Sequence, residues 1–219
     1  MIEFYNFVSG PLAWVAWTIF IVGSIYRLVS MYALAKAKDG SSLAYMSLPY
    51  SLRSIFRWLM PFSTMGWKAD PLMTVATFLF HIGFLLVAVF LGAHVVLWDT
   101  AFGIEIPRLP AQAGDIISFV VIAGCAVFAY RRFAYPHVKN VTRPKDWFTL
   151  ILVVLPFITG VLAYHQVGSP LLMTTLHVLA GELLLALIPF TRLSHALFAL
   201  FTRAYMGSEF GGVRHANDW

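Results

Sequence analysis

The chain has 219 residues, of which 60% are hydrophobic and 11% charged, and its formal net charge at pH 7 is +5. A soluble domain carries roughly 25% charged residues, and disorder needs low hydrophobicity, so the composition excludes both classes. One cysteine, Cys125, excludes a disulfide framework, a paired-cysteine zinc site and haem attached through two cysteines. The basic residues lie between apolar runs, which argues against nucleic-acid binding and indicates a membrane protein.

Five apolar stretches reach the length of about 20 residues that a helix needs to cross a bilayer. They are 11–35, 71–98, 113–133, 147–165 and 170–203. The sequence therefore predicts an all-α integral membrane protein, a single domain over 1–219 with five transmembrane helices in a bundle.

Start signals accompany these stretches. Three of them open with a small or capping residue before a proline, a pattern typical of the first helical turn. The three pairs are Gly10-Pro11, Asp70-Pro71 and Ser169-Pro170. Asp115 and Asp146 are predicted to cap the third and fourth helices.

The distribution of Lys and Arg predicts the orientation. These residues gather after the first and third stretches and at the C-terminal end, whereas the opposite connections carry only Arg108. Because basic residues stay on the cytoplasmic side, we expect the N-terminus outside, in the periplasm, and the C-terminus in the cytoplasm. An odd number of spans agrees with this orientation.

The segment 51–62 has a different pattern from the five spans. Its apolar residues share one helical face, and its arginines lie off that face. The apolar set is Leu52, Ile55, Phe56 and Leu59. We expect an amphipathic helix on the cytoplasmic surface, which is either a connector lying on the membrane or a docking surface for a cytoplasmic partner.

Four of the seven histidines lie inside apolar stretches: His81 and His94 in the second, His177 and His195 in the fifth. A lone intramembrane histidine is often a hydrogen-bonded packing residue, but two pairs on two helices point to function. Because the two helices run in opposite directions, His81 and His195 are predicted near the inner end, and His94 and His177 near the outer end. Two imidazoles facing each other in a bundle suit the axial positions of a haem iron. Two b-type haems at different depths would conduct electrons across the membrane.

The spacing of the histidines tests this arrangement. In a continuous helix, the 18 residues from His177 to His195 are five turns, so both side chains project from one face. The 13 residues from His81 to His94 give an angular offset of about 140° between the two side chains in an ideal helix, so both face the fifth helix only if the second helix is distorted. Two nearby glycines, Gly83 and Gly92, are candidates for the position of this distortion. Zinc is the competing metal, but the helices offer no convergent cysteine or carboxylate cluster.

The histidine segments resemble the γ subunit of respiratory nitrate reductase and its relatives in the membrane complexes of sulfate reducers. The resemblance covers about 11–203 and rests on four motifs. They are FLFHIG at 78–83, RR with PHV within 131–138, LHVLAG at 176–181 and PFTRLSH at 189–195. It implies a membrane cytochrome b with two haem b groups, with His81 and His195 on the inner haem iron and His94 and His177 on the outer.

One departure shifts the resemblance toward the sulfate-reducer proteins. Leu91 stands where the nitrate reductase subunit has its second histidine, and His94 comes three positions later. The segments 51–55 and 90–94 are more similar to cytochrome b subunits of the high-molecular-weight and type II cytochrome c complexes. This likeness implies the bacterial inner membrane, a cytoplasmic heterodisulfide-reductase-like iron–sulfur subunit, a periplasmic multihaem cytochrome c and other membrane subunits.

Two arginines are candidates for binding haem propionates. Arg192 precedes His195 by about one turn, and Arg27 lies near the inner end of the first span. The positive-inside effect explains Arg192 equally well, and Arg27 is alternatively a side chain that reaches the membrane surface.

Three further residues are candidates for quinone or proton chemistry. His165 and Tyr164 end the fourth helix at its outer side, where they lie near a menaquinone or are simply interfacial. Glu182 lies five residues into the membrane from His177. An intramembrane carboxyl group is either functional or a protonated acid bonded within the bundle.

The sequence thus predicts a di-haem b subunit of a respiratory oxidoreductase complex, and not a stand-alone enzyme. It would pass electrons between menaquinone or the periplasmic cytochrome c and the cytoplasmic iron–sulfur subunit. Two alternatives remain: a transporter whose histidines and Glu182 relay protons, and a haem-free membrane anchor.

Overall fold

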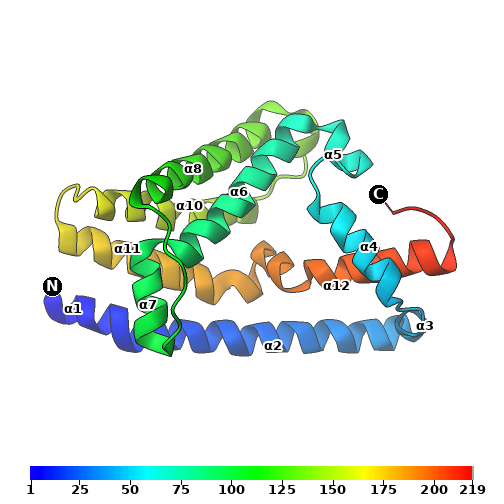
Figure 1. Cartoon of the computed structure of the whole chain (residues 1–219), viewed down its shortest axis with the longest axis horizontal. Helices are drawn as coiled ribbons and strands as arrows, with labels where there is room; N and C mark the ends of the chain where they lie inside the picture. Colours follow the sequence, from blue (N-terminus) through cyan, green and yellow to red (C-terminus); the bar gives the residue numbers. More distant parts are fainter. Residues whose placement is uncertain (219) are drawn as a thin grey trace. The chain divides into compact units, whose positions relative to one another are not determined.

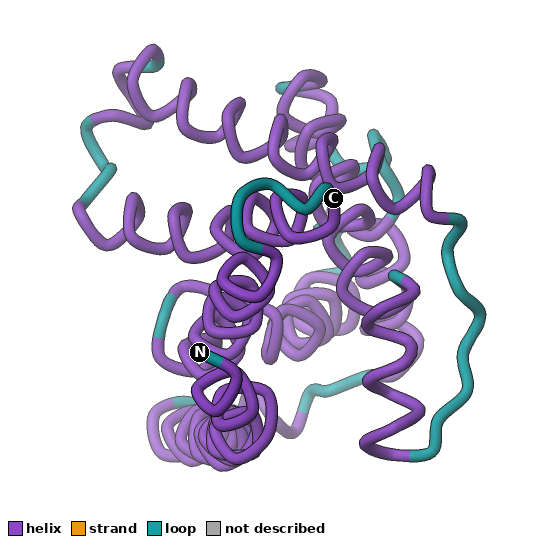
Figure 2. The backbone as a smooth tube through the Cα atoms, turned by 90° about the vertical axis from the view of Figure 1, so that its left-hand side faces the viewer, coloured by secondary structure: helices purple, strands orange, loops and turns teal. Residues whose placement is uncertain are grey.

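The computed structural model describes residues 1–218, with the backbone alone at Ser42. Over this range the chain is helix and loop, with no strand (Figure 2). Five helices are long and apolar enough to cross a membrane. They are Ile2–Lys38, Pro71–Phe90, Ala111–Ala134, Pro144–Tyr164 and Pro170–Phe190. The prediction of an all-α, multi-pass membrane protein is confirmed, and the predicted orientation stays a prediction.

The chain forms two compact units. The first contains Met1–Leu12 and Val75–Leu184, and the second contains Ala13–Thr74 and the chain from Leu185 onward. Each unit is described separately below. The single domain over 1–219 stays a prediction, and its last residue, Trp219, lies outside the described residues.

The first helix begins nine residues before its predicted start at Pro11. It consists of α1 (Ile2–Phe7), the π-helical segment η1 (Val8–Leu12) and α2 (Ala13–Lys38). Pro11 lies inside η1 and does not open the helix, so that start signal was wrong. Proline lacks an N–H donor and crowds the preceding turn, and the wider π turn accommodates it within the helix.

Of the other four predicted starts, those at Pro71 and Pro170 are observed, and Asp146 caps its helix from inside the first turn, because that helix begins at Pro144. Asp70 accepts a hydrogen bond from the Met73 N–H at 3.1 Å, and helices begin at Pro71 and Pro170 as predicted. Asp146 is the third residue of its helix, and it accepts the N–H of Arg143 at 2.8 Å. Asp115 is not a cap, because its helix begins four residues earlier. Its side chain has another partner, described below.

The first unit is built on α8, which α6 and α10 contact. A buried core joins these three helices through Val87, Val121 and Phe157. A Cβ on Gly83 would lie 2.9 Å from a methyl group of Val121, so glycine allows α6 and α8 to pack closely there. The helices of this unit include α6 (Pro71–Phe90), α7 (Gly92–Phe102), α8 (Ala111–Ala134), α9 (Pro136–Lys139), α10 (Pro144–Tyr164) and α11 (Pro170–Leu187).

In the second unit, α4 packs along α12 (Figure 1). Small residues make this contact: Ser51 donates its hydroxyl to the Ala204 carbonyl at 3.0 Å, and a Cβ on Gly207 would overlap Ser54. The helices of this unit include α2, α3 (Gly40–Ala44), α4 (Leu48–Leu59), α5 (Met65–Ala69) and α12 (His195–Gly207), with the π-helical η4 (Ser208–Val213).

The predicted amphipathic helix of 51–62 is observed as α4, shifted toward the N-terminus. Its apolar side chains lie away from α12, because Leu52 is 53% exposed and Phe56 is 73% exposed. Serines occupy the buried face instead. Whether lipid or a partner covers the apolar face stays a prediction.

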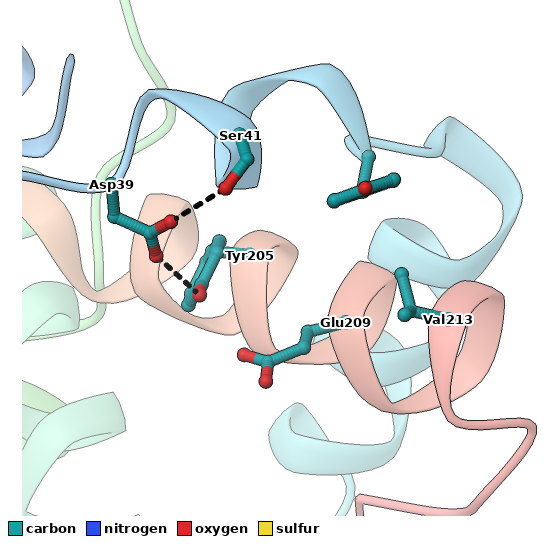
Figure 3. A pocket seen from close by; sticks show the side chains of 6 residues that line it. Asp39, Ser41, Tyr205, Glu209 and Val213 are labelled. Atoms are coloured by element: carbon teal, nitrogen blue, oxygen red, sulfur yellow. Dashed lines mark hydrogen bonds between the residues drawn. The ribbon is translucent and has the colours of Figure 1, made fainter.

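The C-terminal segment returns to the α4–α12 pair. Arg203 and Asp218 form an ion pair at 2.6 Å in which the aspartate side chain is 1% exposed. Ser54 donates a hydrogen bond to the same carboxylate. Nearby, the Asp39 carboxylate accepts hydrogen bonds from Ser41 at 3.0 Å and Tyr205 at 3.3 Å in a small pocket (Figure 3).

Candidate haem-binding site

The second predicted span is interrupted between its two histidines. Leu91 has an extended backbone (φ −62°, ψ 137°), and α7 turns away from the axis of α6 (Figure 1). The Phe90 carbonyl at the break accepts the N–H of Leu109 at 2.8 Å, so it does not need water. This is the distortion that the spacing of His81 and His94 requires. Because the helix is broken between the two histidines, the angle of about 140° calculated for an ideal helix does not describe the directions of their side chains.

The break brings His94 to His177. Their ring centroids are 5.9 Å apart and the ring planes differ by 6°; both residues are partly buried. Two imidazoles on opposite sides of one metal ion, with metal–nitrogen bonds of about 2 Å, have centroids about 6 Å apart. The separation of the predicted outer pair therefore fits one iron between them.

Leu91 occupies a packing position instead. This residue packs against the core of the first unit and over Gly114 of α8. A side chain on Gly114 would overlap Leu91, so the close contact depends on that glycine. The structure thus places His94, and not residue 91, beside His177.

The four predicted ligand histidines share one hydrogen-bonding pattern: each Nδ1 contacts a backbone carbonyl. Because a carbonyl only accepts, Nδ1 carries the hydrogen, and the neutral ring has its lone pair on Nε2. A backbone carbonyl on the remote nitrogen is the usual support of a metal-binding histidine. The pairs are His81 with Thr77 at 2.7 Å, His94 with Val87 at 2.9 Å, His177 with Pro156 at 2.9 Å and His195 with Arg192 at 2.8 Å.

Helix α10 shapes the surroundings of His177. Pro156 supplies the carbonyl, and one turn later a Cβ on Gly160 would lie 2.9 Å from the His177 Cε1. Gly181, one turn after His177 on α11, has open space where its Cβ would be.

The ligand set favours haem over zinc. Nowhere in residues 1–218 do three or more His, Cys, Asp or Glu side chains gather as a metal site. A zinc site needs three or four protein ligands, whereas a haem iron takes two axial nitrogens from the protein. The residues at His94 and His177 fit haem.

The fifth predicted span is also broken, which corrects a prediction. Residues Ile188–Phe190 and Arg192–Ser194 form 3-10 turns, and Thr191 between them is extended. Pro189 has no N–H to continue the helix. His195 is the first residue of α12, so the predicted continuous helix with five whole turns between His177 and His195 is wrong.

His81 belongs to the first compact unit and His195 to the second, so their pairing stays a prediction. Both side chains are exposed. Within the second unit, α2 contacts the interruption before His195, since a Cβ on Gly23 would lie 2.8 Å from the Phe190 ring. Arg27 is one turn beyond Gly23 on the same face of α2.

His165, the candidate at the end of the fourth span, is held differently. Its Nε2, and not its Nδ1, contacts the Asp115 Oδ1 at 2.9 Å, and the Tyr164 ring lies 5.1 Å away. Sequence reasoning missed the Asp115 partner because it assigned that residue to a cap. The signal available was depth: both residues lie at the same predicted end of their spans.

Glu182 is enclosed in the first unit. Both of its carboxyl oxygens are shielded from solvent, and neither has a hydrogen-bond partner among the residues that the structure describes. The choice between a functional carboxyl group and an acid bonded within the bundle stays a prediction.

Comparison with known proteins identifies the family of this chain. Residues 41–169 match the family described as nitrate reductase gamma subunit. The chain belongs to the nitrate reductase gamma subunit family. It is also 35% identical over 211 residues to a protein of Nitratidesulfovibrio vulgaris (strain Hildenborough) whose description is simply "Protein". That similarity covers 94% of this chain and 93% of the relative.

The nitrate reductase gamma family consists of membrane cytochrome b subunits of multi-subunit redox complexes. As a member of this family the chain has a membrane electron-transfer role, and haem b is the cofactor of the family. The family match includes His81 and His94 and ends before His177.

Proposed function

We propose that the chain is a di-haem b subunit that passes electrons across the bacterial inner membrane. The observation that carries the proposal is the His94–His177 pair, 5.9 Å apart with each Nδ1 bonded to a carbonyl. Haem b, when bound, supplies one-electron redox chemistry. The chain holds the group in place, sets its depth and excludes water from it.

The residues divide between two depths. His94 and His177 would bind the outer haem, and His81 and His195 the inner one. Arg27 and Arg192 belong to the unit that contains His195, and they would pair with propionates of the inner haem. The support for the second site is the shared Nδ1–carbonyl pattern of its two histidines.

The partners follow from the direction of the electron path. On the cytoplasmic side we propose a heterodisulfide-reductase-like iron–sulfur subunit, and on the periplasmic side a multihaem cytochrome c or a menaquinone, together with other membrane subunits. Positive residues at the predicted inner end support the orientation. Glu182 and Tyr164 are candidates for proton or quinone contacts beside the outer haem.

The reduced absorption spectrum of the purified protein, with a pyridine haemochrome count, tests the proposal. We expect a b-type α band and two haems per chain. Replacing any of the four ligand histidines by alanine should remove one haem, and His137→Ala, which changes an exposed histidine outside the spans, should remove none. A protein without a b-type band would contradict the proposal and leave a transporter or an anchor.

A further inference from the structure

Helix α10 holds His177 through a carbonyl of its own backbone. Pro156 lies inside α10, and its carbonyl oxygen accepts the Nδ1–H of His177 at 2.9 Å. The other three predicted ligand histidines bond to carbonyls three to seven residues away in the chain, whereas 21 residues separate Pro156 from His177. The hydrogen bond at His177 therefore joins two helices, and a change in α10 can reach the ring.

A second donor reaches the same carbonyl. The Thr159 hydroxyl lies 2.7 Å from the Leu155 oxygen and 3.2 Å from the Pro156 oxygen, and it can donate to either. A threonine inside a helix commonly donates to the carbonyl four residues back. Here the hydroxyl also lies against the carbonyl that supports His177. Thr159 is 8% exposed, so its hydroxyl finds these acceptors inside the protein.

The ring of His177 packs directly on the backbone of α10. A Cβ on Gly160 would lie 2.9 Å from the ring carbon Cε1 and 3.0 Å from Nδ1, so glycine leaves the space that the ring needs beside the carbonyl. Within five consecutive residues, Pro156 supplies the acceptor, Thr159 a competing donor and Gly160 the space. The direction of the Nδ1–H bond is therefore fixed, and its strength depends on the carbonyl.

The number of donors on one carbonyl changes the strength of each hydrogen bond. A carbonyl oxygen has two lone pairs, and each accepted hydrogen bond withdraws electron density from it. A hydrogen from Thr159 therefore weakens the acceptor that Pro156 offers to His177. Without that hydrogen the acceptor is stronger, and the ring becomes a more basic ligand through Nε2. A more basic axial ligand stabilises ferric iron and lowers the reduction potential of a haem.

We propose that Thr159 sets the reduction potential of the outer haem through the Pro156 carbonyl and His177. Thr159 is a positioning residue and not an iron ligand, because it acts through these two other residues. Its hydroxyl raises the potential when it donates to Pro156 and has no such effect when it donates to Leu155. This inference rests on the proposed function, because it needs haem iron at the Nε2 of His177.

The test is a redox titration of the purified holoprotein in detergent, followed at the b-type α band. Thr159→Val removes the hydroxyl at nearly constant volume, and Thr159→Ser keeps it. Thr149→Val is the matched control, because Thr149 lies on the same helix and donates to the carbonyl of Lys145, four residues back, at 2.8 Å. His177→Ala, which should lose only the outer haem, assigns the steps of the titration. A pyridine haemochrome count and the low-spin ferric EPR signal show whether the haems and their ligands are retained.

We expect Thr159→Val to keep both haems and to shift the ratio of ferrous to ferric outer haem about fivefold toward ferric at a fixed potential. This shift corresponds to a midpoint lower by about 40 mV, because 59 mV is a tenfold change for one electron. The step of the inner haem should not move. Thr159→Ser and Thr149→Val should titrate like the wild type.

An unchanged or higher outer midpoint in Thr159→Val, or an equal shift in Thr149→Val, would overturn this role of Thr159 and leave the proposed function standing. Loss of the outer haem from Thr159→Val would also overturn it, because the hydroxyl would then support the ring and not its basicity. A wild-type protein without b haem would overturn the proposed function as well.

Discussion

Gly160 lies directly against the imidazole of His177, because a Cβ at that position would come within 2.9 Å of the ring carbon Cε1. We predict that Gly160→Val displaces His177 and removes the outer haem, leaving one haem per chain. The pyridine haemochrome count measures this. Gly66→Ala is the control, because a Cβ there meets nothing within 4 Å. Two haems in Gly160→Val would show that the ring position does not matter for haem binding.

Pro189→Ala tests the interruption before His195. Alanine favours a helix interior by about 3 kcal/mol relative to proline, so α11 should extend and rotate His195 from its observed direction. We expect loss of the inner haem with the outer haem retained, measured by redox titration of the α band. Pro71→Ala is the control, since Pro71 is the first residue of α6, where proline breaks no hydrogen bond. An unchanged redox titration would show that the direction of His195 does not affect haem binding.

Asp218→Asn tests the C-terminal attachment. Breaking a buried ion pair leaves its partner uncompensated, and Asp218 is almost fully buried beside Arg203. We expect the free energy of unfolding to fall by about 3 kcal/mol, seen as a lower thermal midpoint in detergent. Glu3→Gln, at an exposed site, should change it by less than about 0.5 kcal/mol. Equal midpoints for the two variants would contradict this.

The cluster around Tyr205 and Glu209 should become less stable at both low and high pH. A hydrogen bond from Arg214 lowers the pKa of Glu209, and the hydrogen bond to Glu209 raises the pKa of Tyr205. A lowered acid pKa stabilises the fold above the ordinary value of about 4.3, and this contribution is lost as pH falls through the folded value. A raised tyrosine pKa stabilises it below about 10, and this contribution is lost as pH rises through the folded value.

Hydrogen exchange in η4, corrected for the intrinsic rate, checks this dependence. We expect greatest protection between about pH 5 and 9. Tyr205→Phe should abolish the alkaline loss and keep the acid one, because Arg214 still contacts Glu209. Tyr26→Phe, at an exposed tyrosine, should keep both. Persistence of the alkaline loss in Tyr205→Phe would assign it to another group.

The five spans were predictable from sequence, because apolar length is a local property. Two of the four histidines predicted inside spans, His81 and His177, lie in the observed spans, whereas His94 and His195 follow the interruptions at which the second and fifth spans end. The helix interruptions were only partly predictable. Pro189 was visible as a helix breaker, yet the 18-residue spacing of His177 and His195 suggested a continuous helical face. Near Leu91 the histidine spacing indicated a distortion with Gly83 or Gly92 as its candidate position, but not an extended residue at 91. Its conformation depends on packing against Gly114 and on the hydrogen bond from Leu109 to the Phe90 carbonyl.

The sequence by itself determined that this protein lies in a membrane, that it is helical, and which residue types suit haem. In a bilayer, the need to satisfy every backbone hydrogen-bonding group leaves few possible structures. Only the tertiary structure decided which ring nitrogen His177 and His165 present. That choice depends on acceptors as distant in sequence as Pro156 from His177 and Asp115 from His165. The pairing arises when helices pack, and no pattern within one helix encodes it.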